Sequence, residues 1–185
     1  MNSVPVRPAA PRAARPERPA RPPAPAMPEF DRLDRTHRAA LDMLQAFDRL
    51  LVQLDASGLD DAARQSAAEI MAFFTGPGRQ HHAEEETHVF PVLLAGGDAT
   101  LVQHVHRLQQ DHGWIEEDWR ELAPQIEAIA GGYNWYDMAM LRAALPVFAD
   151  LYHEHIALEE SLIYPAAKRQ KQALQEGSSA RTTTG

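Results

Sequence analysis

One short pattern occurs twice in this chain and places the same polar residues at the same spacing each time. Residues 81–91 read HHAEEETHVFP and residues 155–165 read HIALEESLIYP, so both follow H-x-x-x-E-E-x-x-(V/I)-(F/Y)-P. Residues at positions i and i+4 lie on one face of an α-helix, so each histidine faces the same side as the first glutamate of its pattern. Two such copies are not expected by chance in 185 residues. The repeat therefore favours two equivalent helices whose His and Glu side chains face a common point.

Apolar residues recur at steps of three and four along most of the chain, which is the spacing of a buried helix face. No stretch shows the alternation of a strand. Gly and Pro disfavour a helix interior, so Gly76-Pro77-Gly78 indicates a break or kink. Four long helices with short connections pack antiparallel, so we predict an all-α, up-down-up-down four-helix bundle. The expected helices cover residues of about 29–55, 60–93, 98–129 and 134–174.

Polar residues on the core stripes of these helices point to a metal site. Each helix places one histidine on its stripe, and the second and fourth helices add a glutamate four residues later. Ionisable groups gathered in one buried layer are costly unless they are compensated. Carboxylates can bridge two cations, and neutral imidazoles can bind each of them. A ligand set of imidazole nitrogens and carboxylate oxygens favours iron. The residues that form this predicted metal site are His37, His81, Glu85, His112, His155 and Glu159.

Composition narrows the classes of protein and site that fit. The chain has no cysteine, which excludes disulfides, thiolate nucleophiles and zinc–thiolate sites. Its net charge is −8 although residues 1–28 hold five arginines and one acid, so the remainder is strongly acidic and nucleic acid is not expected as a partner. The apolar runs are too short to span a bilayer, and residues 1–28 lack the apolar stretch of a secretory signal. We therefore expect a cytoplasmic protein that does not enter a membrane.

Residues 1–28 differ in composition from the rest of the chain, because nine of the 14 prolines lie there among Ala and Arg. Such a segment cannot bury enough apolar surface to fold, and we expect a disordered extension with polyproline II character. Residues 29–175 form the expected bundle. The Ser/Thr/Gly-rich residues 176–185 are expected to be a flexible tail.

The repeated pattern makes residues of roughly 29–170 resemble the hemerythrin-like family of HHE cation-binding domains. The resemblance also rests on His37 within the RTHRAAL sequence and on His112 within the QDH sequence. It implies a non-haem centre of two iron ions, oxo- or hydroxo-bridged, that binds dioxygen or related small oxidants. It also implies that the six His and Glu residues named above are the ligands and that Glu85 and Glu159 bridge the two irons.

One difference from the oxygen-carrying members of this family concerns the third helix. Those members have two histidines one turn apart on that helix and five in all, whereas here Leu108 precedes His112 by four residues and Glu116 follows it by four. The set of four His and two Glu is more similar to members linked to iron–sulfur repair and nitrosative stress. Fewer protein ligands leave more open coordination positions, which favours reactivity over reversible carriage.

The sequence leaves three functions open. The first is binding of dioxygen, nitric oxide or peroxide for sensing, storage or stress response. The second is an enzyme or repair factor that reduces nitric oxide or peroxide, or supplies iron to damaged clusters. The third is an interaction bundle in which the metal serves stability alone. No general base, nucleophile or phosphate-binding loop is evident, so the sequence does not decide whether the protein is an enzyme.

Residues beside the expected ligands allow more than one interpretation. Glu116 is either an extra ligand or a solvated carboxylate that flanks the stripe. Glu86 and Glu160 either accept a hydrogen bond from a ligand imidazole or pair with arginine at the surface. His82 and His88 match aliphatic residues in the second copy of the pattern, so we expect both to lie away from the metals.

Overall fold

The computed structural model describes the backbone of residues 30–182 and the side chains of residues 30–176. Every regular element within these residues is helical. The elements are α1 (Phe30–Ser57), α2 (Asp61–Thr75), α3 (Pro77–Glu84), the π-helical turn η1 (Glu85–Val89), α4 (Phe90–Gly96), α5 (Ala99–Gly131), α6 (Met138–Leu158), the π-helical turn η2 (Glu159–Ile163) and α7 (Tyr164–Thr182).

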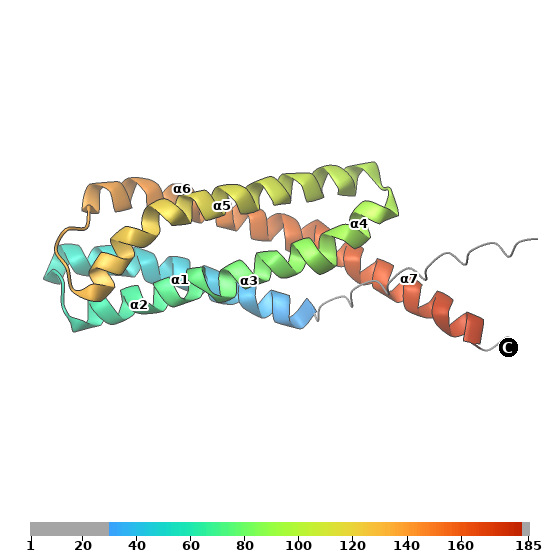
Figure 1. Ribbon diagram of the computed structural model, residues 1–185, viewed down its shortest axis with the longest axis horizontal. Helices are drawn as coiled ribbons and strands as arrows, with labels where there is room; N and C mark the ends of the chain where they lie inside the picture. The colour runs from blue at the N-terminus through green and yellow to red at the C-terminus, as the bar shows by residue number, and fades with distance from the viewer. Residues whose placement is uncertain (1–29, 183–185) are drawn as a thin grey trace, which may run out of the picture.

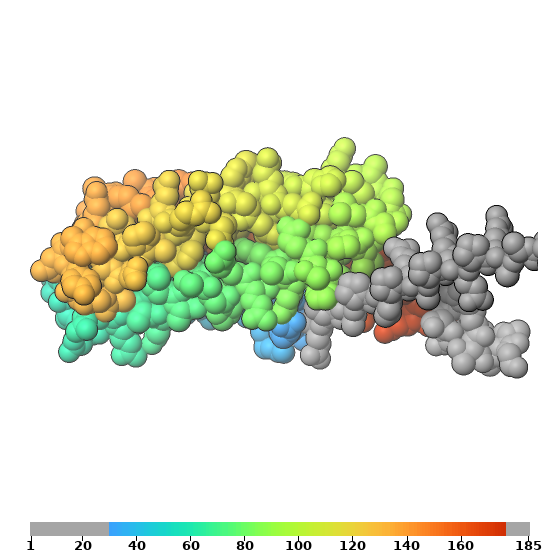
Figure 2. Space-filling view, viewed as in Figure 1, coloured from blue at the N-terminus to red at the C-terminus, as the bar shows by residue number. Residues whose placement is uncertain are grey.

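These elements form four long arms that lie side by side (Figure 1). The arms are α1, the run from α2 to α4, α5, and the run from α6 to α7. α1 contacts α2 and α6, and α5 contacts the same two helices, so each arm has two neighbours. Figure 2 shows α5 and the second arm closing against each other along one face. The predicted all-α, up-down-up-down four-helix bundle is confirmed.

Glycine and aspartate define the turns between the arms. Gly58, Gly97 and Gly132 adopt left-handed backbone conformations, with φ of 73°, 74° and 78°, directly after helix ends. A residue without a Cβ adopts this conformation without steric cost. The helices that follow begin at aspartates whose side chains accept hydrogen bonds from backbone N–H groups of the first turn, namely Asp60, Asp98 and Asp137.

Two π-helical turns interrupt the second and fourth arms at equivalent places, and the sequence analysis did not predict them. η1 begins at Glu85 and η2 begins at Glu159, so each starts at the first glutamate of a repeated pattern. The backbone N–H of Phe90 donates to the carbonyl of Glu85, and that of Tyr164 donates to the carbonyl of Glu159. The proline that ends each pattern has no N–H and crowds the carbonyl four residues earlier, and a wider turn relieves this crowding.

The remaining expectations about the chain's organisation have mixed outcomes. The break at Gly76-Pro77-Gly78 is present, because α2 ends just before it and α3 begins within it. α7 continues to Thr182, beyond the helix end expected near residue 174 and into the expected tail of residues 176–185. The expected extension, residues 1–28, lies outside the described residues. No helix within the described part has both the length and the apolar character that crossing a membrane requires.

Two apolar clusters fill the interior, with a polar layer between them. The larger cluster joins α1, α2, α5 and α6 and includes the aromatic rings of Phe74, Trp119 and Phe148. The smaller cluster joins the start of α1 to α4, α5 and α7 and includes Phe90 and Tyr164. Along every arm, the residues between the two clusters include buried His, Glu or Asp side chains. The candidate site therefore lies inside the bundle, closed by apolar packing at both ends.

Candidate metal centre

The polar layer contains all six residues predicted as metal ligands. Every arm contributes at least one of them, and the two π-helical turns each begin with one of the glutamates. None exposes more than 8% of its surface. The six residues are His37 on α1, His81 on α3, Glu85 on η1, His112 on α5, His155 on α6 and Glu159 on η2.

The six side chains divide into two groups that share their glutamates. Within each group, one ligand atom from every residue lies within 4.8 Å of the others. Glu85 and Glu159 belong to both groups, so the arrangement can hold two cations with both carboxylates between them. One group is His37, His81, Glu85 and Glu159, and the other is Glu85, His112, His155 and Glu159.

Glu159 faces one histidine of each group through a single oxygen. Its Oε2 lies 3.1 Å from Nε2 of His37 and 3.3 Å from Nε2 of His155. His37 reaches this oxygen from α1, whereas His155 lies one turn earlier on the same arm as Glu159. The carboxylate therefore sits between nitrogens that belong to the two different groups.

Glu85 also faces both groups, but with one oxygen toward each. Its Oε1 lies 3.5 Å from Nε2 of His81, and its Oε2 lies 3.5 Å from Nε2 of His112. A carboxylate whose two oxygens point to different nitrogen donors is placed to bridge two cations. The Glu85 side chain has no exposed surface, so water does not compete for these oxygens.

Buried atoms without partners show that this layer fits a metal. Burial of an unpaired polar atom costs about 1–3 kcal/mol, so several in one place require an explanation. The atoms concerned are carboxylate oxygens and imidazole nitrogens, the donor set that iron, manganese and zinc accept. Several buried atoms of the two groups have no hydrogen-bond partner among the described residues. They include Nε2 of His81, His112 and His155, Oε2 of Glu85 and both carboxylate oxygens of Glu159.

Glu86 and Glu160 accept hydrogen bonds from the outer nitrogens of two candidate ligands. The Nδ1 of His112 lies 3.0 Å from Oε1 of Glu86, and the Nδ1 of His37 lies 3.1 Å from Oε1 of Glu160. A proton held on Nδ1 leaves the lone pair of Nε2 directed into the layer. Gln109 steadies Glu86 through a 2.7 Å hydrogen bond from its Nε2. Of the two interpretations for these glutamates, the structure favours the one in which they orient imidazoles.

Replacing Glu86 with glutamine is expected to weaken metal binding by about tenfold to a hundredfold, as loss of such an outer partner generally does. The neutral amide no longer holds the proton on Nδ1 of His112, so Nε2 is presented less well. Glu117→Gln is the matched control, because Glu117 lies on the surface of α5 and pairs there with Arg120 at 3.6 Å. Competition with a chromophoric chelator measures the affinity. Equal affinities in the two variants would refute the orienting role.

Tyr164 is a residue at the site that the sequence analysis missed. Its hydroxyl donates a hydrogen bond to Oε1 of Glu85 and lies 3.1 Å from Nε2 of His37. Its ring stacks on the His37 ring at 5.3 Å between centroids, and at the equivalent place Phe90 stacks on His112 at 5.5 Å. The signal was present at the (F/Y) position of the repeat, where only the second copy carries a hydroxyl.

Asp111 is a second residue that the sequence analysis missed. It is 2% exposed, and its Oδ2 lies 3.9 Å from Nδ1 of His155 and 3.7 Å from Nε of Arg107. The carboxylate therefore faces the outer side of a third candidate ligand. Its only sequence signal was a charged residue immediately before His112 on the stripe.

Glu116 and His88 belong to neither group of candidate ligands among the described residues. Glu116 instead forms an ion pair with Arg79 at 2.9 Å, and its side chain is 36% exposed. The interpretation of Glu116 as a solvated carboxylate beside the stripe is therefore favoured over that of an extra ligand. His88 has a buried Nδ1 without a hydrogen-bond partner, and the expectation that it lies away from the metals stays a prediction.

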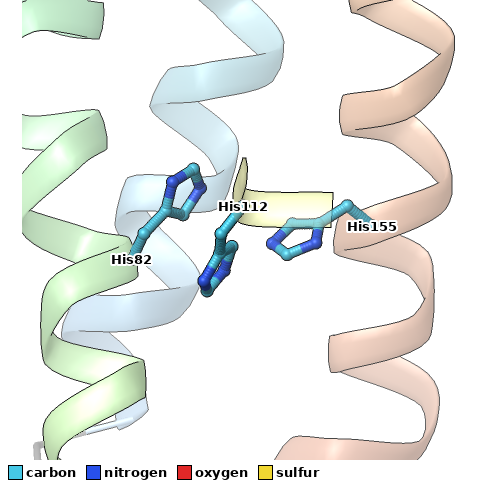
Figure 3. Close-up of side chains that lie close together, drawn as sticks. All are labelled: His82, His112 and His155. Atoms are coloured by element: carbon cyan, nitrogen blue, oxygen red, sulfur yellow. The ribbon is translucent and has the colours of Figure 1, made fainter. Parts of the chain in front are cut away.

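His82 lies closer to the candidate ligands than we expected from the sequence. It forms a third group with His112 and His155, in which one nitrogen from each ring lies within 4.8 Å of the others (Figure 3). The rings of His82 and His112 are stacked with their centroids 4.2 Å apart. His82 therefore lies beside the layer and not away from it.

Burial and neighbouring charges set the protonation of the layer. Burial lowers the pKa of His81 to about 4, against the opposing charge of Glu85, and burial also lowers the pKa of His155. Burial, together with the charge of Glu85, raises the pKa of Glu159 well above its ordinary value. Burial opposes ionisation of Glu85 too, but His81 and His112 outweigh it and lower the pKa of that carboxyl. In the metal-free layer, the neutral forms of His81 and His155 and the protonated form of Glu159 are thus favoured beside an ionised Glu85.

Metal binding at pH 7 is expected to release protons, on the order of one or two per chain. The pKa of Glu159 is raised by burial, and hydrogen bonds to Glu85 and Glu86 outweigh burial and raise the pKa of His112. Both groups carry protons that a cation displaces, whereas His81 is already neutral. As the pH rises through the raised pKa values of these two groups, they lose their protons before metal arrives, so the release falls. Anaerobic titration calorimetry in two buffers of different ionisation enthalpy measures it, and identical heats at pH 7 would contradict the assignment.

Comparisons with known proteins agree with this site. A family model described as the hemerythrin HHE cation binding domain matches residues 29–167. An uncharacterized protein of Haemophilus influenzae is 27% identical over 109 residues, which cover 59% of this chain and 61% of that protein. The chain therefore matches less than two thirds of that relative's length. No solved structure matches the chain. Because the family model covers well over half of the sequence, including all six residues of the two groups, the chain belongs to the hemerythrin HHE cation-binding domain family.

Proposed function

We propose that this protein holds a non-haem, oxo- or hydroxo-bridged pair of iron ions and binds dioxygen, nitric oxide or peroxide there for sensing, storage or stress response. The observation that carries the proposal is the sharing of Glu85 and Glu159 by both four-residue groups. Two separate mononuclear sites would not need common carboxylates. An iron pair supplies reversible one-electron chemistry and Lewis acidity to a small ligand.

The chain's own residues explain how such a centre is kept selective. His37 and His81 serve one ion and His112 and His155 the other, each set with both glutamates. All are buried, and an apolar cluster lies on each side of them. The Tyr164 hydroxyl sits beside Nε2 of His37 and Glu85, where it can donate a hydrogen bond. These features favour a diatomic or peroxide ligand over an organic substrate.

Anaerobic titration of metal-free protein with Fe(II) tests the proposal. We expect binding of two irons per chain, followed on oxidation by the charge-transfer absorption of an oxo-bridged pair. Exposure of the reduced protein to dioxygen and to nitric oxide should then give distinct spectra. Fewer than two irons per chain, with no such absorption, would refute the iron-pair proposal.

A peroxide- or nitric-oxide-reducing enzyme is the second candidate, and Tyr164 is the observation that favours it. Reduction of peroxide to water consumes two electrons and two protons, so an external reductant and a nearby proton donor are both needed. The Tyr164 hydroxyl already donates toward Glu85 in the buried layer. A stable complex in the unaltered protein, with no consumption of peroxide or nitric oxide when reductant is supplied, would exclude this candidate.

Tyr164→Phe tests the role of this hydroxyl and copies the residue found at the equivalent position, Phe90. If Tyr164 supplies a proton, turnover with peroxide should fall by about a hundredfold, the usual size of general acid catalysis. The iron count should stay unchanged, because the ring packing is preserved. Stopped-flow consumption assays measure the effect. Phe90→Tyr is the reciprocal control, and equal turnover in the unaltered protein and Tyr164→Phe would contradict the role.

A further inference from the structure

His82 is a partly buried histidine beside the layer that the proposed centre does not use. It follows His81 directly on α3, and its ring lies against the two histidines of the second group, His112 and His155 (Figure 3). We propose that His82 is a fifth histidine ligand, binding the metal ion that His112 and His155 hold. This inference rests on the proposed two-metal centre and deepens it.

Proximity is the first support for this assignment. Nitrogens of His82, His112 and His155 all lie within 4.8 Å of one another. Metal–nitrogen distances are about 2 Å, so donors on opposite sides of one ion are separated by about 4 Å. Three imidazoles at the observed spacing therefore need only a small contraction to share an ion. The His82 and His155 rings are 5.4 Å apart at 75°, an angle that two rings bound to one ion can adopt.

The carboxylates set what this assignment requires. His82 shares a group with His112 and His155 but not with Glu85 or Glu159. Its ring must therefore move toward the two carboxylates for all five side chains to bind one ion.

The lack of another role for His82 is the second support. No hydrogen bond or ion pair joins it to any other described residue. It lines a small cavity with Ile115, Trp119 and Tyr152, and the charged side chains of Arg79 and Glu116 line the same cavity.

One side-chain rotation accompanies binding. The His82 ring is stacked on that of His112 with 18° between the ring planes, and two stacked rings cannot both direct their in-plane lone pairs at one ion. The torsion that turns an imidazole about its Cβ–Cγ bond is soft and broadly distributed. We therefore expect the His82 ring to turn out of the stack when the metal binds.

The assignment has a consequence for where a small ligand binds. His82 supplies a donor to this ion from α3, the helix that also carries His81. The ion held by His112 and His155 then has one more protein ligand than the ion held by His37 and His81. The open coordination positions are accordingly concentrated on the side of His37, next to the Tyr164 hydroxyl.

Proton NMR of the protein loaded with Co(II) tests the inference without using activity. Each bound imidazole gives one strongly shifted, exchangeable N–H signal, so we expect five signals in the unaltered protein. His82→Ile places at this position the residue that the second pattern carries there, Ile156, and should give four signals. His88→Leu, which likewise copies its counterpart Leu162, is the matched control and should give five. A fall of about tenfold or more in affinity for the ion that His112 and His155 hold should accompany His82→Ile alone.

The outcomes separate the two proposals. Two ions per chain, with the same number of signals in His82→Ile as in the unaltered protein, would overturn the ligand role of His82 and leave the two-metal centre standing. Fewer than two ions in the unaltered protein would overturn both. Because a variant can also lose signals by misfolding, His82→Gly is measured with added imidazole. Return of the fifth signal supports ligation, and its failure to return in a folded protein that binds two ions counts against it.

Discussion

Replacing Glu85 with glutamine is expected to abolish binding of both metal ions, the largest effect of any single change in the site. Each oxygen of Glu85 faces a histidine of a different group, so one side chain would serve both ions of the proposed centre. The neutral amide removes the negative charge and leaves one oxygen donor where there were two. By contrast, His81 belongs to one group, so His81→Ala should weaken one ion and retain the other.

The control for this experiment lies one residue away. Glu84 precedes Glu85 but points to the surface, where it pairs with Arg32 at 2.6 Å. Glu84→Gln makes the same change of charge on the same arm and should keep two irons per chain. Metal analysis after anaerobic loading and desalting gives the count for all three variants. Retention of one tightly bound iron in Glu85→Gln would show that the two ions do not depend on a common carboxylate.

Local geometry explains why part of this site could be predicted from sequence. His81 and Glu85 are four residues apart on one helical arm, so they face the same point whatever the bundle does around them. The same holds for the second copy of the pattern. His37 and His112 stand without a glutamate partner on their helices, and their prediction needed the apolar stripes and the family resemblance as well. The structure buries both of them in the same layer.

The contacts that sequence could not supply are those between arms. His82 and Asp111 each lie next to a stripe position, and whether such a side chain reaches the layer depends on the rotation of its helix. The π-helical turns add to this difficulty, because the extra residue in a turn shifts the register of everything that follows it. Tyr164 comes directly after η2, so a regular helical count from Glu159 misplaces it.

Removal of the metals is expected to destabilise the bundle strongly and unevenly. Ligands that bind only the folded state at a thousandfold excess over their dissociation constant stabilise it by about 4 kcal/mol each. For a domain of this size, a loss of that order corresponds to a fall in melting temperature of roughly 10 °C or more. The metal-free layer keeps buried imidazole and carboxylate atoms without partners, which adds to the difference. Thermal unfolding with and without a chelator measures the change.

The loss of stability should be concentrated at one end of the molecule. The smaller apolar cluster, around Phe90 and Tyr164, is separated from the larger one by the metal layer, and it holds the start of α1 to α4 and α7. Without metals, amide hydrogen exchange should therefore accelerate most in η1, α4, η2 and early α7, and least in α2 and the adjoining half of α5. Glu85→Gln is the internal control, because a chelator should not change its exchange pattern. Uniform acceleration along all four arms of the unaltered protein would show instead that the bundle unfolds as one unit. The two apolar clusters would then depend on the metals to the same degree.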